Sequence, residues 1–277
     1  MRDAMSKNKR YSTSVSPTYE GFMYLDELPY VGYQEKANRY AFPARLVKGE
    51  RVLDVACGSG YGSSYLVGKG AKLVIGLDIL ASAIGYARSN YSSDRLSFIR
   101  ADARNLPFRR DTFDVVVSFE TIEHLTDPQE FLSECQRVLN SDGLFICSTP
   151  NKRISSPYTE KPLNPFHVRE FLPSEFCDLL CEYFAEVSLY GQCDASIIRR
   201  HPVQIISWLL SAIPCGKAIR SILRFLLRRG STTTPQVSAC LGKEIRDEIL
   251  DSRFKIGDFK SGLLYASEFI IAVCKKR

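Results

Sequence analysis

Short apolar runs alternate with helix-forming stretches over the first half of the chain, and this alternation limits the possible folds more than any other feature. The runs are rich in Val, Ile, Leu and Phe and have the length of buried strands. Strands that alternate with helices at this spacing predict an α/β fold, a doubly wound and mainly parallel sheet with helices on both faces. The expected strands span residues 51–57, 73–79, 96–102, 113–120 and 143–150, and the expected helices span 62–70, 82–91 and 127–143.

The helix expected at 127–143 has recognisable end signals. Asp127 is a plausible N-cap, Pro128 follows at the first helical position, and Gly143 lies near the end. We therefore expect Asp127 to cap this helix.

The second half of the chain has a different pattern. Residues 151–168 are rich in Pro, Ser and Asn and predict a loop, which leads into a helix at 173–184. Two further strands are expected at 185–192 and 267–276, which makes seven strands in all. Between these last two strands lies a basic amphipathic stretch, about 195–260, in the position of a helical insertion.

Net charge is concentrated in that insertion. The chain carries +6 overall, whereas residues 195–243 contain no Asp or Glu and eight Lys or Arg, so the remainder carries −2. A protein that is basic in one segment only is unlike one that binds nucleic acid over its whole surface. Nine cysteines without CxxC spacing indicate buried, reduced thiols in a cytosolic protein.

A glycine-rich loop follows the first expected strand. Gly58, Gly60 and Gly62 allow a sharp turn and a close approach of the backbone to a ligand. The dinucleotide fingerprint G-x-G-x-x-G is not matched, because the third glycine comes one residue early and Ser63 takes its place. Asp54, just before the loop, would repel a pyrophosphate but can pair with an ammonium group.

These residues resemble the first motif of class I S-adenosylmethionine-dependent methyltransferases, which have a Rossmann-like sheet. The motif reads VLDVACGSG, with Ala56 where the family usually has its first glycine, and four further motifs follow in order up to residue 151. The resemblance implies that S-adenosylmethionine is the cofactor and that Asp78 accepts its ribose hydroxyls. The full cofactor-binding set that it implies is Asp54, Gly58, Gly60, Asp78, Asp102, Ala103 and Phe119.

A second group of polar residues follows the fourth expected strand. If a helical turn begins there, Glu120, Glu123 and His124 lie at i, i+3 and i+4 on one face. Two carboxylates and an imidazole at this spacing can ligate a divalent cation. Alternatively the carboxylates are solvated and the histidine is a general base without a metal.

The Glu-x-x-Glu-His pattern resembles ubiquinone-biosynthesis O-methyltransferases and small-RNA 3′-terminal 2′-O-methyltransferases. Both resemblances imply that Glu120, Glu123 and His124 bind Mg²⁺ or another divalent cation. The RNA enzymes imply His167 as a fourth ligand, because HVREFLPSEF at 167–176 is similar to their pattern. His167 can instead contact the substrate or cap its loop, and either His124 or His167 can be the catalytic base.

The basic insertion contains a stretch, 203–230, in which Lys217, Arg220, Arg224 and Arg228 recur at helical spacing. Such a helix can lie on an anionic membrane surface as a peripheral contact. We favour the alternative of a lid or dimer helix that packs its apolar side on the core, and we give RNA binding less weight.

The first 29 residues lack the apolar stretch of a signal peptide and are expected to be a disordered or loosely packed leader to one domain at 30–277. No run of about 18 apolar residues occurs. We therefore expect a cytoplasmic protein, with peripheral association with the inner membrane face as the alternative.

Residues 30–192 resemble bacterial methyltransferases encoded among glycan-biosynthesis genes. The function expected from all these features is O-methylation of a small-molecule, saccharide or lipid-linked acceptor, with or without a divalent metal. Two alternatives remain, an RNA 2′-O-methyltransferase and a catalytically silent subunit that binds the cofactor or a partner.

Overall fold

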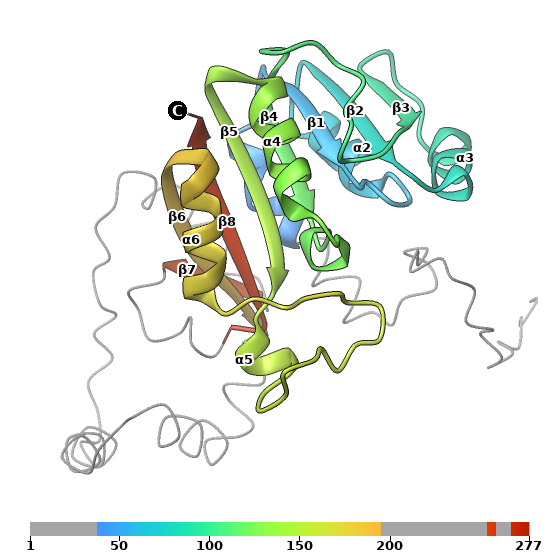
Figure 1. Ribbon diagram of the computed structural model, residues 1–277. Coiled ribbons are helices and arrows are strands. Elements are labelled where there is room, and N and C mark those ends of the chain that lie inside the picture. The colour runs from blue at the N-terminus through green and yellow to red at the C-terminus, as the bar shows by residue number, and fades with distance from the viewer. Residues whose placement is uncertain (1–37, 195–253, 259–266, 277) are drawn as a thin grey trace, which may run out of the picture.

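The computed structural model describes residues 38–194, 254–258 and 267–276, and its centre is one eight-stranded sheet (Figure 1). The strand order is β3-β2-β1-β4-β5-β8-β6-β7. The strands are β1 (Arg51–Val55), β2 (Leu73–Asp78), β3 (Leu96–Arg100), β4 (Phe113–Phe119), β5 (Leu139–Pro150), β6 (Phe184–Asp194), β7 (Phe254–Asp258) and β8 (Phe269–Lys276).

The pairing of these strands confirms a doubly wound, mainly parallel sheet. Strands β1 to β5 pair in parallel, whereas β8 runs antiparallel to both β5 and β6. The sheet has one strand more than expected, because β7 pairs antiparallel with β6. This strand lies inside the expected insertion, so that insertion is not wholly helical.

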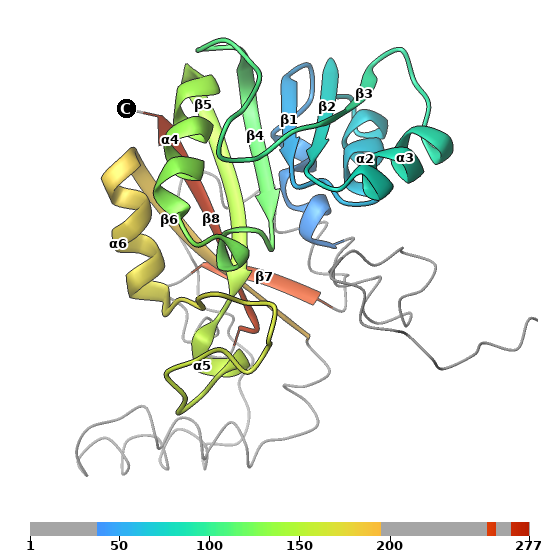
Figure 2. The ribbon, with the colours of Figure 1, turned by 45° about the vertical axis from the view of Figure 1, so that its right-hand side comes forward.

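Helices cover both faces of the sheet (Figures 1 and 2). Alternate residues of a strand point to opposite faces, and Leu53 and Val52 accordingly belong to different core clusters. The cluster around Leu53 includes buried residues of α4 and α6, whereas the cluster around Val52 includes residues of α2. The helices are α2 (Tyr61–Gly68), α3 (Ala81–Asn90), α4 (Pro128–Val138), α5 (Lys152–Ser155) and α6 (Pro173–Tyr183), with 3₁₀ turns η2 (Pro43–Arg45) and η3 (Ile122–His124).

The helix expected at 127–143 is shorter than predicted. Leu139 is already extended, has no exposed surface, and pairs with Phe113 of β4, so tertiary burial ends the helix before Gly143. Pro128 lies at the helix start as expected, but the side chain of Asp127 makes no capping hydrogen bond. Asp127 thus occupies the predicted N-cap position but does not cap the helix through its side chain.

Several predictions lie outside the described residues, among them the leader at 1–29 and the amphipathic stretch at 203–230. No disulfide involves Cys57, Cys135, Cys147, Cys177, Cys181 or Cys274. Among the described residues, none of the helices could span a membrane.

Candidate active site

The glycine loop turns sharply where β1 ends. Gly58 and Gly60 have φ of 54° and 81°, in the left-handed region that favours glycine. A Cβ added at Gly60 would come within 2.7 Å of the Phe98 ring, so space excludes a side chain there as well. Ala56, the departure from the family motif, has φ of 59° and therefore carries backbone strain.

Asp54 lies at the carboxyl end of β1, below this loop. It has no exposed surface, and its oxygens accept hydrogen bonds from Ser63 Oγ at 2.6 Å and from the Tyr40 hydroxyl at 3.0 Å. Burial raises the pKa of this carboxyl from 3.8 to about 7, against the lowering effect of the two hydroxyls. The expected partner of an ammonium group is thus present, but it is sealed beneath other side chains.

Asp78 ends β2 beside the loop, as the ribose role requires. One oxygen accepts from the Gly58 N–H and the other from the Leu80 N–H, both at 2.9 Å. Each carboxylate oxygen has two lone pairs, so one per oxygen remains for a vicinal pair of hydroxyls. Burial raises the pKa of Asp78, although these backbone N–H groups oppose the shift.

The other cofactor residues expected from the motifs stay predictions. Asp102 forms an ion pair of 2.7 Å with Arg104, which lowers the pKa of the carboxyl. Ala103 next to it is half-buried. Phe119 is 9% exposed at the end of β4, with its ring edge-on to Tyr40.

Glu120 does not lie where the helical-face argument put it. Its φ is 52°, and the helical turn η3 begins only at Ile122, so Glu120 is not one turn before Glu123 on a common face. Its carboxylate instead accepts from Ser148 Oγ at 2.7 Å and pairs with Arg39 at 3.3 Å. The expectation of a helical face shared by these residues was wrong.

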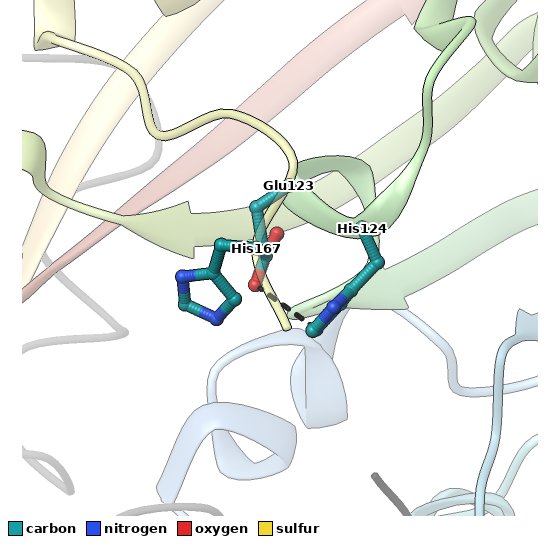
Figure 3. A group of neighbouring side chains, drawn as sticks. All are labelled: Glu123, His124 and His167. Atoms are coloured by element: carbon teal, nitrogen blue, oxygen red, sulfur yellow. Dashed lines mark ion pairs between the residues drawn. The ribbon is translucent and has the colours of Figure 1, made fainter. Parts of the chain in front are cut away.

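Three of the four proposed metal ligands do come together. Glu123, His124 and His167 each offer one ligand atom, and these atoms lie within 4.8 Å of one another (Figure 3). Glu123 has no exposed surface, and its Oε1 has no hydrogen-bond partner among the described residues. Burial, together with the nearby charge of Glu120, raises the pKa of Glu123 well above its usual range.

Both histidines of this cluster are held by their Nδ1 atoms. His124 Nδ1 lies 2.9 Å from the carbonyl oxygen of Phe166, and His167 Nδ1 lies 2.7 Å from Oε1 of the buried Glu170. Because a carbonyl only accepts, His124 carries its proton on Nδ1 and presents a lone pair on Nε2. Burial lowers the pKa of His124, which favours this neutral form.

The carboxylate of Glu170 assigns the same tautomer to a neutral His167, whose Nε2 then accepts from Asn164 Nδ2 at 2.8 Å. His124 offers an Nε2 lone pair, and Glu123 offers Oε1, which lies 4.0 Å from that nitrogen and accepts no hydrogen bond from the described residues. A ligand must replace Asn164 to reach the Nε2 lone pair of His167. Such a set can ligate a cation or remove a proton.

The sequence did not predict three residues that contact the candidate site residues. Tyr40 contacts Asp54, Arg39 pairs with Glu120, and Glu170 orients His167. The first two precede the whole sheet in the chain, and no spacing rule connects them to it. Glu170 lies three residues after His167, which was the one available signal.

The sheet order, the glycine loop and the carboxylates at the strand ends define a class I S-adenosylmethionine-dependent methyltransferase domain. Residues 53–147 match the family model described as a methyltransferase domain.

Named relatives agree with this class. The chain is 41% identical over 150 residues to a probable S-adenosylmethionine-dependent methyltransferase of Mycolicibacterium smegmatis, covering 54% of each chain. It is 33% identical over 128 residues to a ubiquinone biosynthesis O-methyltransferase of Roseobacter denitrificans, covering 46% of this chain and 51% of that one. The chain thus spans about half the length of the curated relatives that it matches.

The fold has solved counterparts. A Thermotoga maritima protein described as an S-adenosylmethionine-dependent methyltransferase, possibly a histamine N-methyltransferase, superposes with a TM-score of 0.55. The alignment covers 87% of this chain and 89% of that one, at 16% identity. At this identity the likeness concerns the fold alone.

Proposed function

We propose that the chain is an S-adenosylmethionine-dependent O-methyltransferase that acts on a hydroxyl of a small-molecule, saccharide or lipid-linked acceptor. The observation that carries this proposal is the cluster of Glu123, His124 and His167. Glu123 and His124 follow β4, at the same sheet edge as Asp54 and Asp78, and His167 comes from the segment between α5 and α6. An O-methyltransferase among the relatives supports the choice of oxygen as the acceptor atom.

The chemistry needs a base close to the acceptor hydroxyl. Nε2 of His124, or Nε2 of His167 after it exchanges its Asn164 contact for the substrate, takes the hydroxyl proton, and the oxygen attacks the sulfonium methyl in line. The new C–O bond forms as the C–S bond breaks, and the electron pair of the C–S bond stays on sulfur. The products are the methyl ether, S-adenosylhomocysteine and a protonated histidine. The low pKa of His124 keeps it neutral before the reaction.

The same residues fit a divalent cation. Glu123 Oε1 is buried without a hydrogen bond from the described residues and lies 4.0 Å from His124 Nε2, and one ring nitrogen of His167 completes a donor set of two nitrogens and one oxygen. Imidazole ligands suit transition ions such as Zn²⁺ or Fe²⁺ better than Mg²⁺. We propose Glu123, His124 and His167 as its ligands, and a bound cation would lower the pKa of a coordinated acceptor hydroxyl.

Two variants test the cation site, because the chain offers a matched pair of glutamates. Glu123→Gln removes a cluster ligand, whereas Glu120→Gln removes a carboxylate that is engaged by Arg39 and Ser148. Titration calorimetry with Mn²⁺ on the full chain should show binding lost in the first variant and retained in the second. Equal affinity in both variants would contradict the assignment.

An RNA acceptor is the second candidate. The contact between the His124 and His167 rings, with centroids 4.9 Å apart, supports it, because His167 was expected there only from the likeness to RNA 2′-O-methyltransferases. Peripheral membrane contact through 203–230 stays a separate proposal, because that stretch lies outside the described residues.

One screen tests the function as a whole. Methyl-labelled S-adenosylmethionine is incubated with the full chain, with and without Mn²⁺, and with panels of phenols, glycans, lipid-linked hydroxyl compounds and short RNAs. We expect label on an oxygen of one class of acceptor and none after His124→Ala. Absence of cofactor binding by calorimetry would overturn the enzyme proposal and leave a silent subunit.

A further inference from the structure

Tyr40 lies against the expected cofactor edge, although it comes from the segment before the sheet. Its hydroxyl donates to Asp54, with oxygen distances of 3.0 and 3.3 Å to the two carboxylate atoms. Its ring packs edge-on against Tyr61 and Phe119, at centroid distances of 5.2 and 4.9 Å. The phenol is therefore fixed at the point where β1, α2 and β4 meet.

The glycine loop is shaped around this ring. A Cβ added at Gly62 would lie 2.0 Å from the ring carbon Cζ of Tyr40, closer than atoms can approach. The first turn of α2 therefore lacks a side chain at the place that the tyrosine fills. The Tyr40 ring and the backbone at Gly62 are therefore complementary in shape.

Asp54 is covered by the residues that donate hydrogen bonds to it. It has no exposed surface, and both hydroxyl groups that contact it come from buried residues. Of these two, Ser63 has no exposed surface, whereas Tyr40 keeps 5%. Of the two residues that donate to Asp54, Tyr40 is therefore the one that keeps any exposed surface.

A phenol has one hydrogen to donate and two lone pairs that accept. Because the Tyr40 hydrogen points to Asp54, its oxygen is left as an acceptor, and donation to a carboxylate strengthens it in that role. An ammonium group has only donors and suits such an oxygen. We propose that Tyr40 is a cofactor-binding residue that receives the ammonium group of S-adenosylmethionine, with Asp54 acting through it.

The neighbouring residue keeps Tyr40 in place without opposing a cation. Arg39 is 2% exposed, donates to Gln192 Oε1 at 2.8 Å, and lies 4.1 Å over the Phe269 ring. Its ion pair with Glu120 offsets its positive charge. The segment is thus anchored to β6 and β8 while the phenol faces the loop.

The test separates the amino-acid end of the cofactor from its nucleoside end, and it rests on the proposed function. Affinities of the full chain for S-adenosylmethionine and for 5′-methylthioadenosine, which lacks the amino-acid end, are measured by calorimetry. Tyr40→Phe should lower the affinity for S-adenosylmethionine about tenfold and keep the affinity for 5′-methylthioadenosine within about twofold of that of the unaltered chain. Tyr65→Phe, a half-exposed tyrosine on α2, is the matched control and should change neither.

Three outcomes contradict the proposal in distinguishable ways. Unchanged affinity of Tyr40→Phe for S-adenosylmethionine would overturn the role of Tyr40 alone. Equal weakening of both ligands would show that the hydroxyl is merely structural. Failure of the unaltered chain to bind either ligand would overturn the proposed function together with this inference.

Discussion

The carboxylate of Glu170 holds the imidazole of His167, with Oε1 2.7 Å from Nδ1. Glu170 is itself 2% exposed and accepts a further hydrogen bond from Ser155 Oγ at 2.5 Å. The pair resembles the arrangement in which a carboxylate fixes the tautomer and direction of a functional histidine. It leaves Nε2 of a neutral His167 as an acceptor, which receives a hydrogen bond from Asn164 Nδ2 at 2.8 Å.

We expect His167 and Glu170 to act as one unit in the reaction, because the carboxylate fixes the direction of the imidazole. Removal of either should lower the rate of methyl transfer by about 10- to 100-fold. The double variant His167→Ala/Glu170→Ala should be little worse than the worse single variant, because such effects are not additive. Rates of all three variants in the labelled-methyl assay check this. Full additivity would show that Glu170 acts elsewhere, and Glu170→Gln, which keeps an acceptor, should retain more activity than Glu170→Ala.

The pH dependence of cofactor binding should report the state of Asp54. Because the pKa of this carboxyl is about 7 in the fold, it is protonated and neutral below that pH and charged above it. An ammonium ligand gains from the charged form, so affinity for S-adenosylmethionine should rise from pH 6 to 8. Calorimetry across this range checks the trend, and a flat profile would contradict it. Asp54→Asn should remove the rise.

The Asp54 carboxyl should also make folding stability depend on pH, with stability falling and cofactor affinity rising as pH increases. A carboxyl whose pKa rises from 3.8 to about 7 on folding binds its proton more tightly in the folded state. Its stabilising contribution, about 4 kcal/mol, is present below pH 4 and is lost as pH rises to 7. Asp54→Asn should therefore flatten the loss of stability between pH 4 and 7. Urea unfolding at several pH values measures this, and an unchanged slope would argue against the raised pKa.

Gly62 and Gly85 form a matched pair of helical glycines. Alanine at Gly62 would collide with the Tyr40 ring, whereas nothing lies within 4 Å of a Cβ added at Gly85. Gly85→Ala should stabilise the protein by about 1 kcal/mol, because alanine is the better helix former. Gly62→Ala should destabilise it by about 1–3 kcal/mol, as overpacking does. Thermal unfolding compares the two, and stabilisation by both would show that Tyr40 moves aside without cost.

Ala56 tests the strain in the turn after β1. Its left-handed φ costs an L-residue about 1–2 kcal/mol, which glycine avoids. Ala56→Gly should therefore keep or raise the melting temperature, despite the larger freedom of glycine in the unfolded chain. Ala81→Gly, at the start of α3, is the control and should lower it. A drop of equal size in both variants would mean that the turn carries no strain at Ala56.

Local sequence pattern was sufficient for the parallel sheet. Each expected strand from 51–57 to 143–150 overlaps an observed one, because buried parallel strands need continuous apolar runs. Local pattern was insufficient to predict where α4 ends and that β7 forms, because tertiary contacts decide both. Helix α4 ends at Val138 because Leu139 pairs with β4, and β7 exists because β6 offers an edge for pairing.

The candidate site divides in the same way. The sequence by itself determined the glycine loop and the strand-end carboxylates Asp54 and Asp78, because motif and strand end lie within a few residues of each other. The resemblance implied that His167 joins Glu123, whereas only the tertiary structure decided that Glu120 pairs with Arg39 and that Glu170 holds His167. These contacts depend on how distant segments pack and on which buried charges find partners, and no periodicity along the chain encodes that.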